Sequence, residues 1–136
     1  MKYLKKIGLP FEEIEKRFLE GVESLDFKVL YTHDMQQILS EHGTRLQGRC
    51  KIYEICNAEL AKALFTSEMA ISLVLPCRIA IYEENGSGYI GLIRPSHLVE
   101  MVTTDHAIKT LVKKLENELV AILERRFSES VTDGES

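Results

Sequence analysis

The feature that most constrains the fold of this chain is a glycine-rich turn between two short runs of β-branched, aromatic and other apolar residues. The turn spans residues 85–88 (Asn-Gly-Ser-Gly), and the runs span 77–83 and 89–94. Asparagine and glycine tolerate the positive φ angles that tight hairpin turns require. The pattern therefore predicts an antiparallel pair of strands. The turn also resembles a phosphate-binding loop superficially, but the lysine and helix of such a loop do not follow it.

Two longer stretches carry hydrophobic residues at every third or fourth position, which is typical of amphipathic helices. The first continues to about residue 25 and has Pro10 at its first position, where the missing N–H of proline would be unpaired in any case. The second begins after Thr104 or Asp105, because either side chain can cap a helix, and it ends at Phe127.

The segments between these helices predict further strands and short helices. A short helix over 33–41 is expected to begin with Thr32 as its cap. The resulting order is α-β-α-β-α-β-β-α, without a linker or an internal repeat, and it predicts a single α+β domain over residues 1–127. The remaining expected elements are strands over 27–31 and 50–55, a possible short strand over 71–74 and a turn of helix over 96–101.

Composition and charge narrow the classes of protein to consider. The chain has 136 residues, of which 45% are hydrophobic, and a formal net charge of −4, so we expect a globular core and no nucleic-acid binding. The longest apolar run, 69–76, is too short to span a bilayer, and the N-terminus lacks the apolar stretch of a signal peptide. Three cysteines do not suggest a secreted disulfide framework. We therefore expect a cytoplasmic protein without a membrane interaction, and a disordered acidic tail over residues 128–136.

Two cysteines flank the most distinctive unit, a predicted strand, helix and second strand. Asn57 is a good N-cap for a helix from Ala58 onward, so Cys56 lies directly before a helix N-terminus, where the pKa of a thiol can be lowered. Cys77 opens the next strand after Pro76. Either both thiols are small buried hydrophobes, or they face one cleft as ligands, a redox pair or a nucleophile with a helper. Cys56 and Cys77 are candidate ligands for zinc or copper, but no spacing selects a histidine to join them.

The other polar residues predict no catalytic set. The histidines are scattered and are expected at the surface or at caps, and Asp34 is expected in the first turn of a helix rather than as a base. Glu83 and Glu84 are expected as solvated charges at a strand end. Whether the protein is an enzyme therefore stays open, and no cofactor is assigned. The histidines are His33, His42, His97 and His106.

Several of these residues together resemble the domain-of-unknown-function family 302 over about residues 18–99. The resemblance implies a two-layer α/β sandwich with a curved, mainly antiparallel sheet, similar in topology to half of the TATA-binding protein, and a homodimer. It implies no activity, but it supports a site shared by the two cysteines. The family usually has proline where this chain has Ala58, and often an acidic residue where this chain has His33. The residues that carry the resemblance are Asp34, Cys56-Asn57, Leu75-Pro76-Cys77-Arg78 and Tyr82-Glu83.

Three functions are compatible with the sequence. The first is a module that binds or senses a small ligand or a soft metal ion, with a site near Cys56, Asn57 and Cys77. The second is sulfur transfer or redox exchange, with Cys56 as thiolate and Cys77 as its partner. The third is a structural or interaction protein in which both cysteines are buried. The lack of an acid–base–nucleophile set favours the first.

The homodimer is also predicted from apolar residues beyond the main stripes of the two long helices. Exposed apolar patches usually mark an interface, and a symmetric pair is the commonest closed assembly. We expect a two-fold contact through a helix face or a sheet edge. The alternative is that the long helices pack on each other and on the sheet within one chain. The additional residues are Leu19, Val112, Leu119, Val120 and Leu123.

Overall fold

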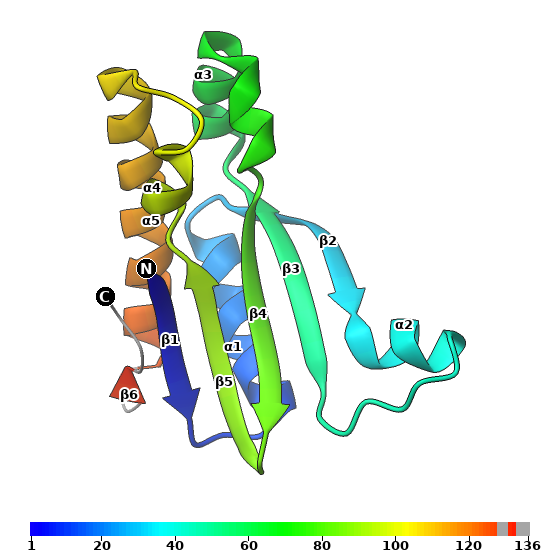
Figure 1. Cartoon of the computed structure of the whole chain (residues 1–136). Coiled ribbons are helices and arrows are strands. Elements are labelled where there is room, and N and C mark those ends of the chain that lie inside the picture. Colours follow the sequence, from blue (N-terminus) through cyan, green and yellow to red (C-terminus); the bar gives the residue numbers. More distant parts are fainter. Residues whose placement is uncertain (128–130, 133–136) are drawn as a thin grey trace.

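The computed structural model describes residues 1–127 and 131–132, which form a mixed α/β fold with an open antiparallel sheet (Figure 1). The predicted α+β class is confirmed. Five main strands and five α-helices make up the described part of the chain, with one 3₁₀ helix and a two-residue strand. The elements are β1 Lys2–Ile7, α1 Phe11–Ser24, β2 Lys28–Asp34, α2 Met35–Glu41, β3 Cys50–Cys56, α3 Ala58–Ser67, η1 Met69–Leu73, β4 Cys77–Glu84, β5 Ser87–Ile93, α4 Pro95–Val99, α5 His106–Arg126 and β6 Val131–Thr132.

The strands lie in the order β2-β3-β4-β5-β1, and all neighbours are antiparallel. The predicted hairpin is confirmed, because β4 and β5 pair around a turn in which Asn85 and Gly86 have positive φ. Of the segment 128–136, the structure describes only β6, which pairs with Lys5 and Lys6 of β1. The other residues of the predicted disordered tail lie outside the described residues.

The N-terminal strand β1 was not predicted from the sequence. The strand lacks a clear alternation of polar and apolar residues, because a lysine occupies one of its inward positions. That lysine, Lys5, is only 3% exposed. The Nζ atom of Lys5 donates to the carbonyl oxygen of Phe127 at 2.9 Å and lies 3.2 Å from a carboxylate oxygen of Glu124. The buried charge is thus paired, as a charge in a low-dielectric environment must be.

One face of the sheet is covered by α1 and α5, and the hydrophobic core lies between these layers (Figure 1). Ile81 of β4 and Ile90 of β5 are fully buried there, and the ring of Tyr53 packs on Phe18 of α1 with 5.0 Å between centroids. Full burial of one such side chain stabilises the fold by about 1.5–3 kcal/mol. Among the described residues, no helix packs across the opposite face of the sheet, so the structure has two layers.

The two long helices pack on each other within one chain. The prediction that their additional apolar residues need a second subunit to cover them is therefore wrong for most of these residues. Gly21 lets the two helices approach closely, since a Cβ atom there would lie 2.6 Å from Cγ2 of Ile122. The contacts of α5 with α1, α3 and α4 bury three of the residues counted as surplus, namely Val112, Leu119 and Leu123. Val120 is half-buried, and Leu19 remains 37% exposed.

Two predicted caps are confirmed and one is wrong. Asn57 accepts from the backbone N–H of Leu60 at 3.1 Å, and Asp105 caps α5. The short helix α2 begins at Met35 rather than at residue 33, with Asp34 as its cap in place of Thr32. The reason is that Thr32 still pairs with β3, so β2 continues to Asp34 before the chain turns into a helix.

The predicted short strand over 71–74 is also wrong, because residues Met69–Leu73 form the 3₁₀ helix η1. A brief apolar run cannot be assigned to strand or helix by its periodicity alone. The predicted turn of helix near residue 96 is confirmed as α4, one residue earlier. The Leu75–Pro76 peptide bond that leads into β4 is cis.

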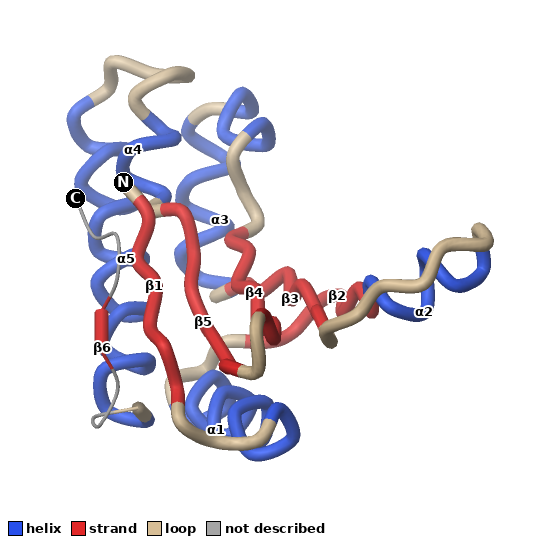
Figure 2. The backbone as a smooth tube through the Cα atoms, turned by 60° about the horizontal axis from the view of Figure 1, so that its bottom comes forward, coloured by secondary structure: helices blue, strands red, loops and turns tan. Residues whose placement is uncertain are grey.

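The helices around the open face stand at its margins. Helix α2 lies apart from the other helices beyond the far end of β2, whereas α3 and α4 lie beyond the opposite end of the sheet (Figure 2). No helix of the described residues is long and apolar enough to cross a membrane. The open face is therefore the region in which the fold leaves side chains without a covering layer.

Candidate ligand-binding groove

The fold brings Cys56 and Cys77 to one small cavity. Strand β3 ends at Cys56 and β4 begins at Cys77, and Ile55 lies directly opposite Cys77 in the strand register. The cavity has a volume of about 130 Å³. Asn57 also borders it, although its side-chain oxygen is occupied as the cap of α3. The remaining lining is apolar and includes Leu30, Leu64, Phe65 and Leu115.

The electrostatics of this cavity favour protonated thiols. Burial, with smaller contributions from the neighbouring Cys56 and from Glu116, raises the pKa of Cys77 to about 12. Burial also raises the pKa of Cys56, so the position before a helix N-terminus does not produce a net lowering. Because the thiolate is the reactive form, these directions are opposite to those of an activated cysteine.

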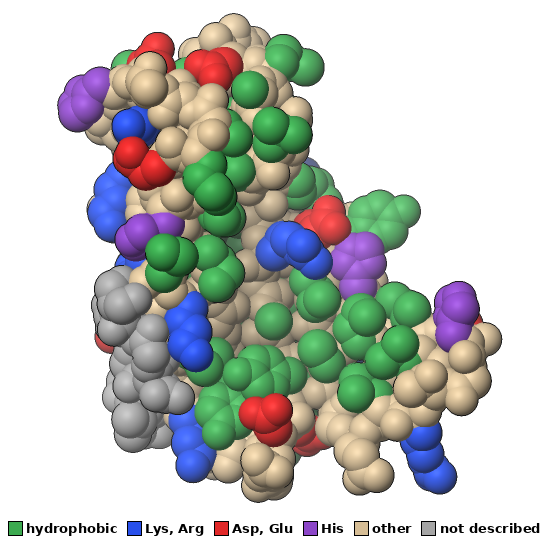
Figure 3. All heavy atoms as spheres, in the orientation of Figure 1, with side chains coloured by type: hydrophobic (Ala, Val, Ile, Leu, Met, Phe, Trp, Pro, Cys, Tyr) green, Lys and Arg blue, Asp and Glu red, His purple; other side chains and the backbone are tan. Residues whose placement is uncertain are grey.

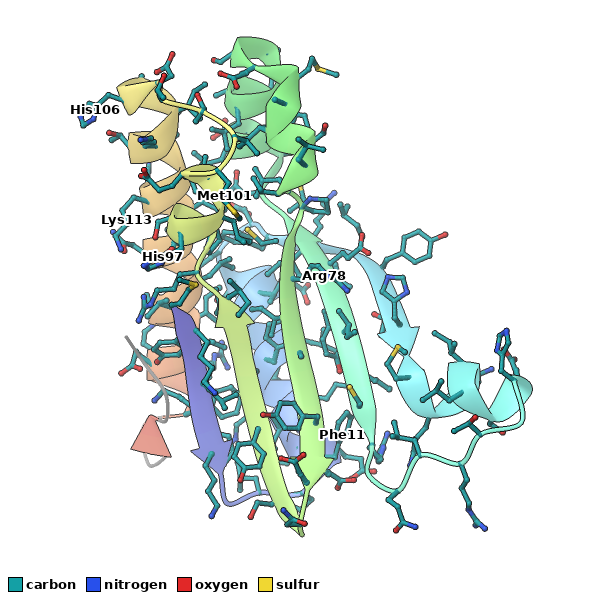
Figure 4. All side chains as sticks on the ribbon, viewed as in Figure 1. Phe11, Arg78, His97, Met101, His106 and Lys113 are labelled. Carbon is teal, nitrogen blue, oxygen red and sulfur yellow. The ribbon has the colours of Figure 1, made fainter. Side chains whose placement is uncertain are left out.

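The described residues assemble no metal centre around these thiols. No group of three or more histidine, cysteine or acidic side chains lies close enough together within this part of the chain. Of the histidines, His33 pairs with Glu54, with 2.8 Å between Nε2 and Oε2, and His42 Nδ1 donates to the carbonyl oxygen of Ile38. His97 and His106 are exposed on α4 and α5 and point away from the sheet (Figure 4).

A larger groove lies directly beside the thiol cavity, on the open face of the sheet. Its volume is about 410 Å³, and both hollows share Pro76 and Cys77 in their linings. Its floor is formed by strands β1, β3, β4 and β5, and its upper wall by the segments that precede β4 and form α4. Hydrophobic side chains cover this face (Figure 3). The main apolar lining residues are Leu4, Ile52, Val74, Ile93, Pro95 and Leu98.

The floor of the groove contains two adjacent positions with almost no side chain, of which Ala80 keeps the floor low and Gly91 admits strand β1. Ala80 of β4 and Gly91 of β5 are register partners. A Cβ atom on Gly91 would lie 2.4 Å from the backbone oxygen of Tyr3 and 2.8 Å from Cδ1 of Leu4, so β1 occupies the space of a side chain there. Ile52, opposite Ala80 on β3, stands beside this low floor and forms a wall.

Two cations border the groove, and no acidic side chain lines it among the described residues. Arg78 projects from β4 over the open face (Figure 4), and Lys2 lies on β1. Within the described part of the chain, neither side chain makes a hydrogen bond or an ion pair. Glu54 is the register partner of Arg78, but its Oε2 atom lies 2.8 Å from Nε2 of His33.

The upper wall of the groove is fixed by a buried carboxylate. Glu116 of α5 is fully buried and accepts from the backbone N–H of Ser96 at 2.9 Å, which ties α4 to α5. Its other oxygen lies 2.8 Å from Nζ of Lys113 and 3.5 Å from a guanidinium nitrogen of Arg94. Burial raises the pKa of Glu116, but the hydrogen bonds from Lys113 and Ser96 outweigh burial and hold the pKa below its ordinary value.

The fold and the groove together define a small α+β protein with a preformed apolar hollow on an open sheet. The family model described as "Domain of unknown function DUF302" matches residues 3–125, and the chain belongs to this family. A crystal structure titled "uncharacterized conserved protein DUF302 from Bacillus stearothermophilus" is similar, with 29% sequence identity and a TM-score of 0.85. The match covers 91% of this chain and 96% of that one. No curated protein matches the sequence.

Sequence reasoning found the thiols but missed the groove beside them. Its key residues are Arg78, Ala80, Gly91 and Lys2, which come from three strands and meet only through the register. One signal was present in the sequence. Residues 89–93 of strand β5 are apolar at both alternating sets of positions, and such a strand does not have one face simply turned to water.

Proposed function

We propose that this protein binds a small apolar or amphipathic ligand in the open-face groove, next to Cys56 and Cys77, as a binding or sensing module. The observation that carries the proposal is the preformed apolar hollow of about 410 Å³ over Ala80 and Gly91. Small-molecule sites are typically concave, mainly apolar and of about 300–1,000 Å³. A ligand that covers this lining would gain about 25 cal/mol for each Å² of apolar surface removed from water.

The chemistry around the groove supports binding more than catalysis. No acid–base–nucleophile set is assembled beside it among the described residues, and both neighbouring thiols have raised pKa values. These values also count against the sulfur-transfer or redox function, which needs a thiolate. Two thiols without a third donor within reach offer a soft metal ion an incomplete set of ligands. The three free cysteines support a cytoplasmic location, since reducing compartments keep thiols unpaired.

Filling the floor of the groove tests the proposal. Ala80→Leu places a larger side chain on the floor of the groove, and Ala107→Leu, at an exposed position of α5, is the matched control. With 1-octanol as probe in isothermal titration calorimetry, we expect saturable binding by the wild type and by Ala107→Leu, and at least about ten-fold weaker binding by Ala80→Leu. Equal binding by a folded Ala80→Leu variant, with native circular dichroism, would overturn the groove as the site.

We also propose that the protein forms a two-fold dimer, whose contact includes the helical segments above the open face. Large apolar side chains are exposed there: Met69 (72%), Leu73 (76%) and Met101 (73%). Monomers seldom leave extended apolar patches uncovered. Helix α1 offers less, because only Leu19 remains exposed among its large hydrophobic residues.

Light scattering at micromolar concentration tests the dimer and its location. A mass near the 15.5 kDa of one chain would defeat it, whereas twice that value is expected. Leu73→Glu should then yield the monomer, because a charge cannot be buried in an apolar contact without a partner. Leu19→Glu is the control for a contact through α1. Dissociation by Leu19→Glu alone would move the interface to that helix.

A further inference from the structure

We propose that the ligand of the groove carries a carboxylate at one end of an aliphatic body, and that Arg78 binds this carboxylate. This inference rests on the proposed function, which it sharpens by naming the chemical class of the ligand. The groove would otherwise accept any apolar molecule of suitable size, since most of its lining makes no directional contact.

The charges of the groove are arranged at one end. Ala80 of β4 and Gly91 of β5 are register partners in an antiparallel pair, so Arg78, two residues before Ala80, lies beside Ile93, two residues after Gly91. On the next strand, Lys2 of β1 is the register partner of Ile93. Arg78, Ile93 and Lys2 therefore form one row across β4, β5 and β1. Neighbouring strands lie about 4.8 Å apart, so the two cations are about 10 Å apart at the backbone. Their long side chains can both approach a group between them.

The rest of the groove is apolar. From the row of cations toward the β4–β5 turn, the open face presents the small floor of Ala80 and Gly91, flanked by Leu4 and Ile52, and then the ring of Tyr82. A ligand that matches this pattern has one charged end and an uncharged body. At about 30 Å³ for each water-sized group, the groove holds on the order of ten non-hydrogen atoms.

Arg78 is available for an external anion. Its register partner Glu54 is held by His33 at 2.8 Å, and no ion pair or hydrogen bond engages the Arg78 guanidinium among the described residues. A guanidinium presents parallel N–H donors that fit both oxygens of a carboxylate. Two cations and the nearby Glu54 leave an excess of one positive charge, which suits a singly charged carboxylate better than a doubly charged phosphate.

The test compares two probes of equal chain length, octanoate and 1-octanol, by isothermal titration calorimetry on the full chain. We expect the wild type to bind octanoate about ten-fold more tightly than 1-octanol, because charge-assisted hydrogen bonds are the stronger kind. Arg78→Met should remove this preference and leave 1-octanol binding within about two-fold. Arg45→Met, at an exposed position in the loop before β3, is the matched control and should behave as the wild type.

The outcomes separate the two proposals. Binding of 1-octanol with no preference for octanoate in the wild type would overturn the carboxylate and leave the groove as a site. Binding of neither probe would overturn the proposed function itself. Retention of the octanoate preference by Arg78→Met, and by Arg78→Gln as a second variant, would show that Arg78 does not bind the anion. A preference that weakens at high salt in the wild type only would support the proposal.

Discussion

Two lysines of strand β1 show how differently the two faces of the sheet are built. Lys5 points into the covered face, is 3% exposed, and is held by the Phe127 carbonyl and by Glu124. Lys2 points to the open face and is exposed, and its side chain makes no hydrogen bond or ion pair with the described residues. A lysine thus stabilises the fold at position 5, whereas at position 2 it is a cation that can bind an external anion.

The same contrast holds for the charges beyond β1. Glu116, under the covering helices, has its oxygens engaged by Ser96, Lys113 and Arg94. Arg78, on the open face, has no such partner in the described part of the chain. The charged groups Lys5 and Glu116 are both paired under the helices, because an unpaired buried charge is costly. A binding site for a charged ligand is therefore expected on the open face, where charged side chains have no partner within the described part of the chain.

The largest expected effect comes from shortening one isoleucine on each face. Ile81 is fully buried under α1, whereas Ile52 is only half-buried on the open face. Ile81→Ala should lower the free energy of unfolding by about 2–5 kcal/mol, because it leaves a cavity in the core. Ile52→Ala should cost less than about 1.5 kcal/mol, because water can reach the site. Urea unfolding of both variants measures the difference, and equal losses would mean that the open face is covered in solution.

The lysine pair gives the next largest effect. Lys5→Met removes the donor to the buried Phe127 carbonyl and should destabilise the fold by about 1–3 kcal/mol. Lys2→Met touches no internal partner and should change stability by less than about 0.5 kcal/mol. Thermal and urea unfolding at low ionic strength report both values. A comparable loss from Lys2→Met would show that Lys2 has a structural role and would weaken the contrast between the faces.

The local elements of the fold follow from the sequence because their causes are local. The hairpin depends on Asn85 and Gly86, and the starts of α3 and α5 depend on the capping side chains of Asn57 and Asp105. Strand β1 does not follow, because its inward Lys5 disguises the alternation and its partner β5 lies more than 80 residues away. Its contribution to the fold is decided by tertiary contacts.

The candidate site was only half accessible to sequence reasoning for the same reason. Cys56, Asn57 and Cys77 belong to one distinctive stretch of sequence, so they could be singled out. The floor of the groove depends on the pairing of Ala80 with Gly91, and its charged row on the pairing of Lys2 with Ile93. Neither small residues nor single charges stand out in a sequence until the register sets them side by side.

The pH dependence of stability sharpens the contrast at Glu116. Its folded-state pKa lies below the ordinary value of 4.5, so the carboxylate stabilises the fold above about pH 4.5 and this contribution is lost as the pH falls through the folded pKa. Glu116→Gln should therefore destabilise the protein at pH 7, by on the order of 1–2 kcal/mol. The gap between variant and wild type should shrink below pH 4.5. Urea midpoints from pH 3 to pH 7 check this, and a constant gap would rule out the ionised carboxylate as the cause.

The smallest expected effect concerns the two thiols, which lie where the covered and open faces meet. With a pKa of about 12, Cys77 has a thiolate fraction of about 10⁻⁵ at pH 7, so iodoacetamide should label it far more slowly than a free thiol. Cys56 is half-exposed and should react faster than Cys77, yet no faster than an ordinary cysteine, because burial raises its pKa too. Mass spectrometry of time courses between pH 6 and pH 9 separates the two sites. Labelling of Cys56 at pH 7 faster than a free cysteine of pKa about 8.5 would show an activated thiolate, and it would favour thiol chemistry over ligand binding.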